Sequence, residues 1–200
     1  IENGNLEIQA LYQPGFTGTD NSGNEYTADY TSGRLNTAGK SEWTYGRFEI
    51  RAKLPDGRGS WPAIWMLGSS ISTIGWPACG EIDIMEHVGF DEGNIHASIH
   101  TTTFNHTLGT QKTGHINVPT ATDSFHVYTL EWTANYMYFM VDDQPLHFVY
   151  NDGQNDHNKW PFDNDAFIIL NIAVGGDWGG VQGVNNSAFP MRMLVDYVRV

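Results

Sequence analysis

The sequence predicts an all-β protein, an antiparallel β-sandwich of the jelly-roll type with a curved inner face. The first observation is strict alternation of apolar and polar side chains over Arg47–Leu54 and again over Asn94–Thr101, the pattern of a strand with one buried and one solvated face. The second is composition, because only 16% of residues are charged and there are 22 glycines. The third is that no stretch shows a sustained helical period with caps.

Apolar runs bounded by turn residues predict the other strands. Turn chemistry separates several of them, for example at Pro55–Gly57 and at Asp142–Asp143. In chain order, the strands expected besides the two alternating ones are Leu6–Leu11, Ala63–Leu67, Glu81–Val88, Phe125–Trp132, Tyr136–Val141, Leu146–Tyr150, Phe167–Val174 and Arg192–Val200.

Length and charge restrict the classes of protein and partner. With 200 residues the chain fits one domain, expected to span 1–200. The formal net charge of −13 repels polyphosphates, so no nucleic-acid partner is expected, whereas a neutral substrate is not repelled. The sequence contains no run of apolar residues long enough to span a membrane. Its single cysteine, Cys79, permits no internal disulfide.

One predicted strand, Glu81–Val88, carries three acidic residues. Side chains alternate along a strand, so Glu81 and Asp83 share one face. In a regular strand Glu86 would point into the core, where an unpaired charge is costly. A one-residue β-bulge near Met85 resets the phase and places Glu86 beside Asp83. Three carboxyl groups are therefore expected on one face.

Three like charges on one face repel one another, and catalysis explains them better than stability does. Hydrolysis of a glycoside with retention needs two carboxyl groups about 5–5.5 Å apart, one as nucleophile and one as acid/base. The long side chains of Glu81 and Glu86 are able to lean toward each other, while the shorter Asp83 is placed to bond a neighbour and tune its pKa. The alternative from spacing alone is a solvated acidic strand face, with or without a bound cation.

Aromatic residues near the acidic strand favour the catalytic interpretation. Trp61, Trp65 and Trp76 precede the strand, and His100 follows it. Sugar rings stack their C–H faces on tryptophan, so these residues suit a carbohydrate substrate.

The segment Trp76–Glu86 reads W-P-A-C-G-E-I-D-I-M-E, with its acids spaced E-x-D-x-x-E. Together with five further stretches in the same order, this motif resembles glycoside hydrolase family 16 over nearly the whole chain. The extra Met85 resembles the laminarinase branch of that family, since the lichenase branch has the shorter E-x-D-x-E. The further stretches are Tyr30–Leu35, Tyr45–Glu49, Trp61–Leu67, Asn171–Trp178 and Val195–Val200.

The resemblance implies a concanavalin A-like jelly roll and a retaining endo-glycosidase. Such an enzyme hydrolyses laminarin-like β-1,3-glucan by double displacement and needs no catalytic cofactor. In those terms Glu81 is the nucleophile, Glu86 is the general acid/base, and Asp83 assists by orienting Glu81. The substrate-binding residues that the resemblance implies are Arg34, Asn36, Trp61, Trp65, Trp76, His100 and Trp178.

The resemblance also implies properties outside the cleft. The family commonly carries one structural calcium ion on its convex side, and the matching positions are Glu2, Gly46 and Asp196, whose oxygens suit calcium. The chain begins inside the family's pattern, so the family's usual N-terminal segment is expected to lie outside 1–200. A secreted monomer is expected, with the glucan itself as its partner.

Several alternatives stay open at the level of sequence. The same chemistry serves a mixed-linkage β-1,3-1,4-glucanase or another family polysaccharidase such as an agarase. A retaining enzyme also becomes a transglycosylase when a sugar, rather than water, accepts the glycosyl group. A jelly roll alone suits a non-catalytic, lectin-like carbohydrate-binding module as well, because fold does not decide function. A pure binder, however, has no need of mutually repelling acids.

Overall fold

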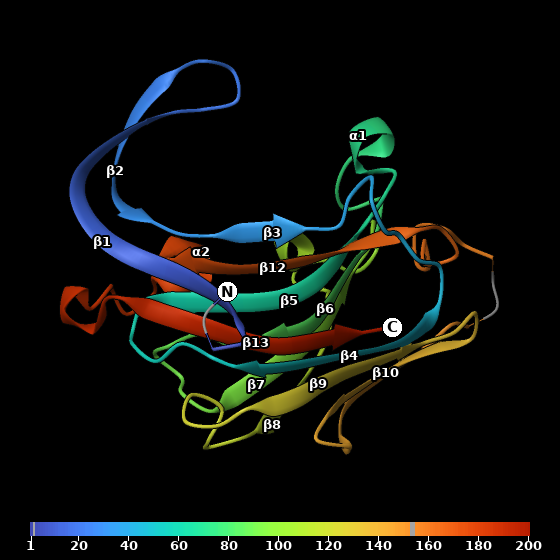
Figure 1. The fold of residues 1–200 in the computed structure, drawn as a ribbon. Coiled ribbons are helices and arrows are strands. Elements are labelled where there is room, and N and C mark those ends of the chain that lie inside the picture. The colour runs from blue at the N-terminus through green and yellow to red at the C-terminus, as the bar shows by residue number, and fades with distance from the viewer. Residues whose placement is uncertain (2, 153–154) are drawn as a thin grey trace.

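Two antiparallel sheets face each other in the structure, a computed structural model that describes residues 1, 3–152 and 155–200 (Figure 1). The seven-stranded sheet has the order β11-β10-β9-β4-β13-β1-β2, and the six-stranded sheet has the order β3-β12-β5-β6-β7-β8. All recorded strand pairs are antiparallel. The predicted all-β sandwich of the jelly-roll type is confirmed.

The elements are short and follow one another closely. The strands are β1 (Leu6–Thr19), β2 (Glu25–Thr31), β3 (Arg34–Asn36), β4 (Gly46–Lys53), β5 (Ser60–Gly68), β6 (Glu81–Glu86), β7 (Asn94–His100), β8 (Lys112–Asn117), β9 (His126–Trp132), β10 (Tyr136–Val141), β11 (Gln144–Tyr150), β12 (Ala166–Val174) and β13 (Met191–Arg199). The helical segments are α1 (Ile71–Ile74), η1 (His106–Leu108), α2 (Gly176–Gly179) and η2 (Asn186–Ala188).

Strand β4 shows how the sequence pattern builds the core. Phe48, Ile50 and Ala52 are fully buried between the sheets, while the charged residues between them face outward. On that outer face Arg47 forms ion pairs with Glu49 and with a glutamate on the neighbouring strand β9. The predicted alternation is therefore confirmed, and it places one apolar row of the seven-stranded sheet in the core.

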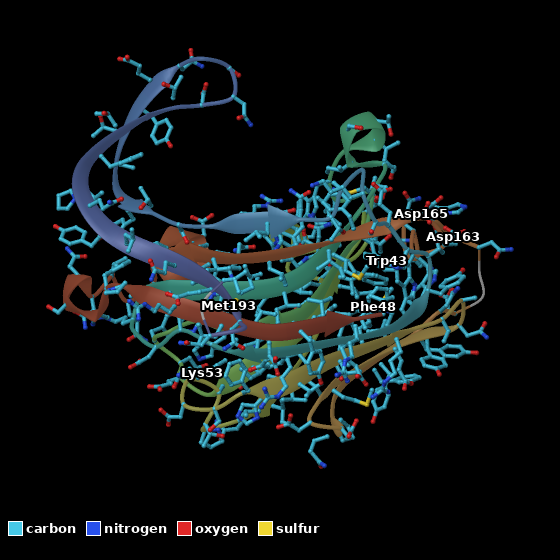
Figure 2. All side chains as sticks on the ribbon, in the orientation of Figure 1. Trp43, Phe48, Lys53, Asp163, Asp165 and Met193 are labelled. Atoms are coloured by element: carbon cyan, nitrogen blue, oxygen red, sulfur yellow. The ribbon has the colours of Figure 1, made fainter. Side chains whose placement is uncertain are left out.

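Aromatic rings fill the space between the sheets at one end of the sandwich. Phe48 meets Trp43 edge-on, with 5.8 Å between ring centroids (Figure 2). The Phe48 ring also lies 6.3 Å from the Trp132 ring between centroids. The indole N–H of Trp132 donates to the backbone carbonyl of Phe162 at 3.1 Å, which satisfies a polar atom that burial would otherwise leave unpaired. The large rings therefore fill the space between the two sheets at this end, and the indole N–H of Trp132 is not left buried without a hydrogen bond.

The six-stranded sheet carries apolar residues on both of its faces. Ile168 and Leu170 of β12 point into the main core, whereas Phe167 and Ile169, which alternate with them, point to the concave face. There they form a second, smaller apolar cluster against which Trp65 packs. The buried members of this cluster are Leu67, Cys79, Phe167 and Ile169. The floor of the concave face is therefore rigid and mostly apolar.

The sequence missed three strands and shortened another. Strands β2, β3 and β8 were not predicted, and β1 continues to Thr19 instead of ending at Leu11. These segments are rich in polar residues and mostly exposed, so the apolar signal used for prediction is weak in them. Each α-helix within the described residues has four residues, too short to cross a membrane.

Replacing Phe48 with alanine is expected to lower the free energy of unfolding by about 3–5 kcal/mol, because a fully buried ring is replaced by a cavity. Urea unfolding followed by tryptophan fluorescence measures the change. Val198→Ala is the control, since Val198 pairs with Ile50 but is 42% exposed, and it should shift stability by about 0.5 kcal/mol or less. Equal effects of the two substitutions would contradict the core assignment.

Candidate active site

The β-bulge predicted near Met85 is present in β6. Consecutive residues of β5 pair with Asp83 and with Met85, so Ile84 is the extra residue on the bulged strand. Ile84 and Met85 both lie in the core. Glu86 therefore returns to the concave face and lines the same cavity as Asp83.

This cavity has a volume of about 420 Å³ and lies on the concave face. A cavity of that size, in which aromatic and apolar residues alternate with polar and charged side chains, suits a small molecule or a sugar. Its lining residues are Ser32, Gly33, Arg34, Trp61, Ala63, Trp65, Glu81, Asp83, Glu86, Asn171, Ile172 and Ala173. All three predicted catalytic acids are thus brought together.

Glu86 is held from one side by two tryptophan rings. The indole N–H of Trp61 donates to Glu86 Oε1 at 2.9 Å. Trp178, carried by α2, meets Trp61 edge-on at 5.6 Å between ring centroids. The Trp178 ring also meets the His96 ring edge-on, with 5.0 Å between centroids. His96 pairs with Glu86 across β6 and β7. Trp61 therefore orients the half-buried Glu86 carboxyl group, and Trp178 packs against Trp61.

Glu81 and Asp83 share a buried histidine. His100 Nε2 lies 3.2 Å from Asp83 Oδ2 and 3.8 Å from Glu81 Oε1. Asp83 is only 3% exposed, which rules out the alternative of a solvated acidic strand face. The three ligand atoms lie within 4.8 Å of one another, but a zinc or calcium ion needs further ligands, and within the described chain no other His, Cys, Asp or Glu joins them.

Burial raises the pKa of all three acids. The pKa of Glu81 is raised to about 8, mainly by burial and then by the charge of Asp83, while His100 opposes the shift. The pKa of Asp83 is raised well above its usual value by burial and by Glu86. Burial also raises the pKa of Glu86, against the lowering effect of the Trp61 hydrogen bond. Because ionising one acid disfavours ionising the next, the cluster keeps at least one proton near neutral pH.

The predicted substrate-binding residues surround the acids, with one exception. The Arg34 guanidinium lies 5.0 Å from the Trp65 ring centroid, and the indole N–H of Trp65 donates to Asn171 Oδ1 at 2.7 Å. Trp76 lies at the Glu81 end of the site, 6.1 Å from His100 between ring centroids. Asn36 follows Arg34 on β3 but does not line the cavity.

The Asn36 side chain is engaged locally instead. Its Oδ1 accepts a hydrogen bond from the backbone N–H of Ala38 at 3.1 Å, which stabilises the turn after β3. The structure therefore brings Arg34, but not Asn36, to the cavity wall.

Three residues of the site were not singled out as site residues from the sequence. Asn171 lines the cavity, and His96 faces it beside Glu86. His106 is exposed at the start of η1, in keeping with the loop or surface position that the sequence suggests, and its ring lies 5.0 Å from Trp76 and 5.2 Å from His100 between centroids. The alternation of β7 places His96 on the same face as His100, so the sequence could have indicated His96 as a site residue. No sequence pattern indicates that His106 lies near Trp76.

The predicted calcium ligands are not brought together. Glu2 lies outside the described residues. Gly46 is at the start of β4, whereas Asp196 lies at the bulge of β13 opposite Arg51, five residues further along β4 and hence about 16 Å away. The Asp196 carboxylate accepts a hydrogen bond from Arg51 at 2.6 Å instead. Gly46 and Asp196 therefore do not fit a shared calcium ion.

A concave sandwich face with clustered acids and tryptophans defines the class of a carbohydrate-active protein. The sequence model of glycosyl hydrolases family 16 matches residues 5–199, and the chain belongs to this family. A β-glucanase from Rhodothermus marinus is 54% identical over 178 residues, which are 86% of this chain and 62% of that protein. The chain thus spans less than two thirds of this relative.

Two solved structures share the fold over the whole chain. The laminarinase from Rhodothermus marinus has a TM-score of 0.89 at 48% identity, and the match covers 78% of that chain. SCLam, a non-specific endo-β-1,3(4)-glucanase, has a TM-score of 0.91 at 46% identity, with 72% of its chain covered. The resemblance stated from motifs is therefore confirmed at the level of family and fold.

Trp61→Phe is expected to raise the pKa of Glu86, because it removes the indole N–H that stabilises the ionised carboxylate. Titration of the glutamate side-chain carboxyl ¹³C shifts by NMR measures this pKa. Trp65→Phe is the matched control, since it removes an indole bonded to Asn171 and should leave the Glu86 pKa unchanged. A Glu86 pKa that stays constant in Trp61→Phe would contradict the assigned hydrogen bond.

Glu81→Gln is expected to stabilise the protein at alkaline pH. The folded-state pKa of Glu81 is raised from 4.5 to about 8, so the wild type loses stability as pH rises through this window, by up to about 1 kcal/mol per pH unit. The neutral amide avoids that loss. Thermal unfolding of both proteins at pH 4.5 and at pH 8.5 should show a gain for the variant that appears only at the higher pH, and an equal difference at both would contradict the raised pKa.

Proposed function

We propose that this protein is a retaining endo-glycosidase that hydrolyses laminarin-like β-1,3-glucan. The observation that carries the proposal is the bulge of β6, which places the half-buried Glu81 and Glu86 and the buried Asp83 along one sugar-sized cavity. Family membership and the β-glucanase and laminarinase relatives support the choice of polymer.

The proposed reaction has two displacements. In the first, the Glu81 carboxylate bonds to the anomeric carbon while the glycosidic C–O bond breaks, and Glu86 gives its proton to the departing sugar oxygen. In the second, Glu86 takes a proton from water, whose oxygen attacks the anomeric carbon and releases Glu81. Two inversions give a product of retained β configuration, and only carboxyl groups and water are needed.

The proton distribution of the free protein differs from the assigned catalytic roles. A pKa of about 8 favours a proton on Glu81, whereas the Trp61 N–H favours a charge on Glu86, the reverse of the assigned roles. Asp83 lies between them and is electrostatically linked to both. Ionisation of the three carboxyl groups is therefore coupled, and the proposed roles of Glu81 and Glu86 rest on the E-x-D-x-x-E motif of the family, not on these pKa shifts.

Substrate recognition is proposed to rest on aromatic stacking. Trp61 and Trp65 line the cavity, and Arg34 stacked on Trp65 offers donors to sugar hydroxyls. The net charge of −13 disfavours sulfated polymers. A lectin-like module is disfavoured because burying three acids is costly without a chemical use. No feature of the site favours agarose or mixed-linkage glucan over β-1,3-glucan.

We further propose that the protein acts outside the cell as a monomer. A polymeric substrate does not cross a membrane, which supports the extracellular location. The strongly acidic surface disfavours self-association, which supports the monomer. Calcium has no part in the proposal, because Gly46 and Asp196 lie apart.

Glu81→Ser and Glu86→Gln are each expected to lower the release of reducing sugar from laminarin by several orders of magnitude while the fold is retained. Circular dichroism checks the fold. Glu131→Gln is the control, since it also removes one carboxylate but lies on the outer face of β9 beside Arg47. Full activity in either cleft variant would contradict the mechanism. Parallel assays on lichenan, agarose and xyloglucan test the polymer.

The roles of the two glutamates are distinguishable by added azide. In Glu81→Ser azide attacks from the vacated face and should give the α-glycosyl azide with an activated glucoside. In a Glu86→Ala variant azide attacks the glycosyl-enzyme and should give the β-glycosyl azide. NMR of the anomeric proton reads the configuration, and the opposite pair of products would reverse the roles.

A further inference from the structure

Strands β1 and β2 extend beyond the sandwich as a two-stranded arm, residues 11–31. β1 pairs with β13 only through Leu6–Ala10, and from Leu11 onward its recorded strand partner is β2. Figure 1 shows this ribbon leaving the two sheets and curving away from them. A two-stranded hairpin without a packed face is only marginally stable in water. The side chains that the arm exposes therefore need a reason besides folding.

Aromatic side chains gather on one face of the arm. Tyr12 and Tyr30 are directly opposed, with ring centroids 5.5 Å apart. Toward the tip, Phe16 pairs with Ala28, and the Tyr26 ring folds across Gly18, its opposite residue. Tyr26, Ala28 and Tyr30 alternate along β2 and so share a face, while the bulge in β1 between Tyr12 and Phe16 keeps both rings in line with them.

The aromatic face is open to solvent. Tyr12 is 39% exposed, Phe16 is 38% exposed and Tyr26 is 47% exposed. At the base, Phe189 stacks on Tyr30 at 5.3 Å between centroids, and the Tyr30 hydroxyl donates to Asn186 Oδ1 at 2.7 Å. The base is therefore fixed to the body, and the aromatic surface continues past it to the tip.

The opposite face of the arm is polar. It carries the directly paired Thr17 and Thr27, flanked along β2 by Glu25 and Asp29. The arm is thus a two-faced ribbon in which only one side carries exposed rings. Because Phe16 and Tyr26 stay exposed near the tip, packing within the fold does not account for this aromatic side.

The arm leads directly into the catalytic cavity. Thr31, its last residue, is followed by Ser32, Gly33 and Arg34, all of which line that cavity. The backbone carbonyl of Gly33 accepts a hydrogen bond from Ile172 of β12, at 3.4 Å, which fixes this junction to the cleft floor. A polymer lying in the cleft therefore reaches the arm when it extends past β3.

From this continuity we infer that the aromatic face of the arm, Tyr12, Phe16, Tyr26 and Tyr30, binds a second stretch of neutral glucan chain next to the cleft. The inference rests on the proposed function. Exposed tyrosine rings offer flat apolar faces for sugar C–H groups and hydroxyls for hydrogen bonding. The carboxylates of Asp20, Glu25 and Asp29 on the same arm repel anionic polymers and repel a second copy of the arm.

The test compares two double variants of the full chain. Phe16→Ser/Tyr26→Ser removes the tip rings, and Thr17→Ala/Thr27→Ala changes the adjacent pair on the opposite face. We expect the ring variant to bind insoluble β-1,3-glucan about three- to tenfold more weakly in sedimentation assays, with kcat/KM on a short laminari-oligosaccharide unchanged. The threonine variant should match the wild type in both assays.

Equal binding of all three proteins to the insoluble glucan would overturn the inference. Loss of activity on the short oligosaccharide in the ring variant would also overturn it, because the arm would then act on the cleft. Tyr26→Phe keeps the ring and should retain binding, and the single Tyr26→Ser variant replaces the double one if circular dichroism shows misfolding.

The same experiments also test whether the aromatic face of the arm binds a second copy of the protein instead of glucan. A dimer in sedimentation velocity that the ring variant abolishes, together with unchanged glucan binding, would assign the face to a second copy and overturn the inference. The binding assay does not depend on turnover. A wild type that binds glucan through the arm but hydrolyses none would defeat the proposed function alone.

Discussion

The bulge at Ile84 and Met85 is the constraint on which the site depends. A strand in the middle of a sandwich has one face for the core and one for the cleft, and its side chains alternate strictly between them. Two consecutive residues, Ile84 and Met85, both turn to the core, and the acid that follows is returned to the cleft. The protein thereby keeps a continuous apolar interior directly beneath a row of acids.

The burial of those acids ties stability to chemistry. Burial raises the pKa of each carboxyl group, and the charge of Asp83 raises that of Glu81 further. His100 opposes the shift at Glu81, and the Trp61 hydrogen bond opposes it at Glu86. Trp61 donates to one end of the row and His100 approaches the other, so the ionised forms are not left wholly unpaired. A site that holds protons near neutral pH is thus obtained from packing, with few charged partners.

Much of the fold and the cluster of three acids could be predicted from the sequence, because both depend on the alternation of side chains along strands. The pattern of β4 located the core, and the one residue out of phase in β6 predicted the bulge before any coordinates. The arm, β3 and β8 escaped prediction, since their strands are polar and their pairing partners are set by tertiary contacts. The separation of Gly46 from Asp196 depends on strand register, and the approach of His106 to Trp76 depends on the path of the loop after β7. No local pattern encodes either.

Strand β3 closes the six-stranded sheet with only three residues. Its free edge exposes too few backbone N–H and C=O groups to template a strand from another molecule. The cleft therefore opens at a margin that resists sheet-to-sheet aggregation, even though rows of aromatic residues lie on either side of it. An open cleft and an edge strand that offers little to a second sheet are in this way compatible in one small sandwich.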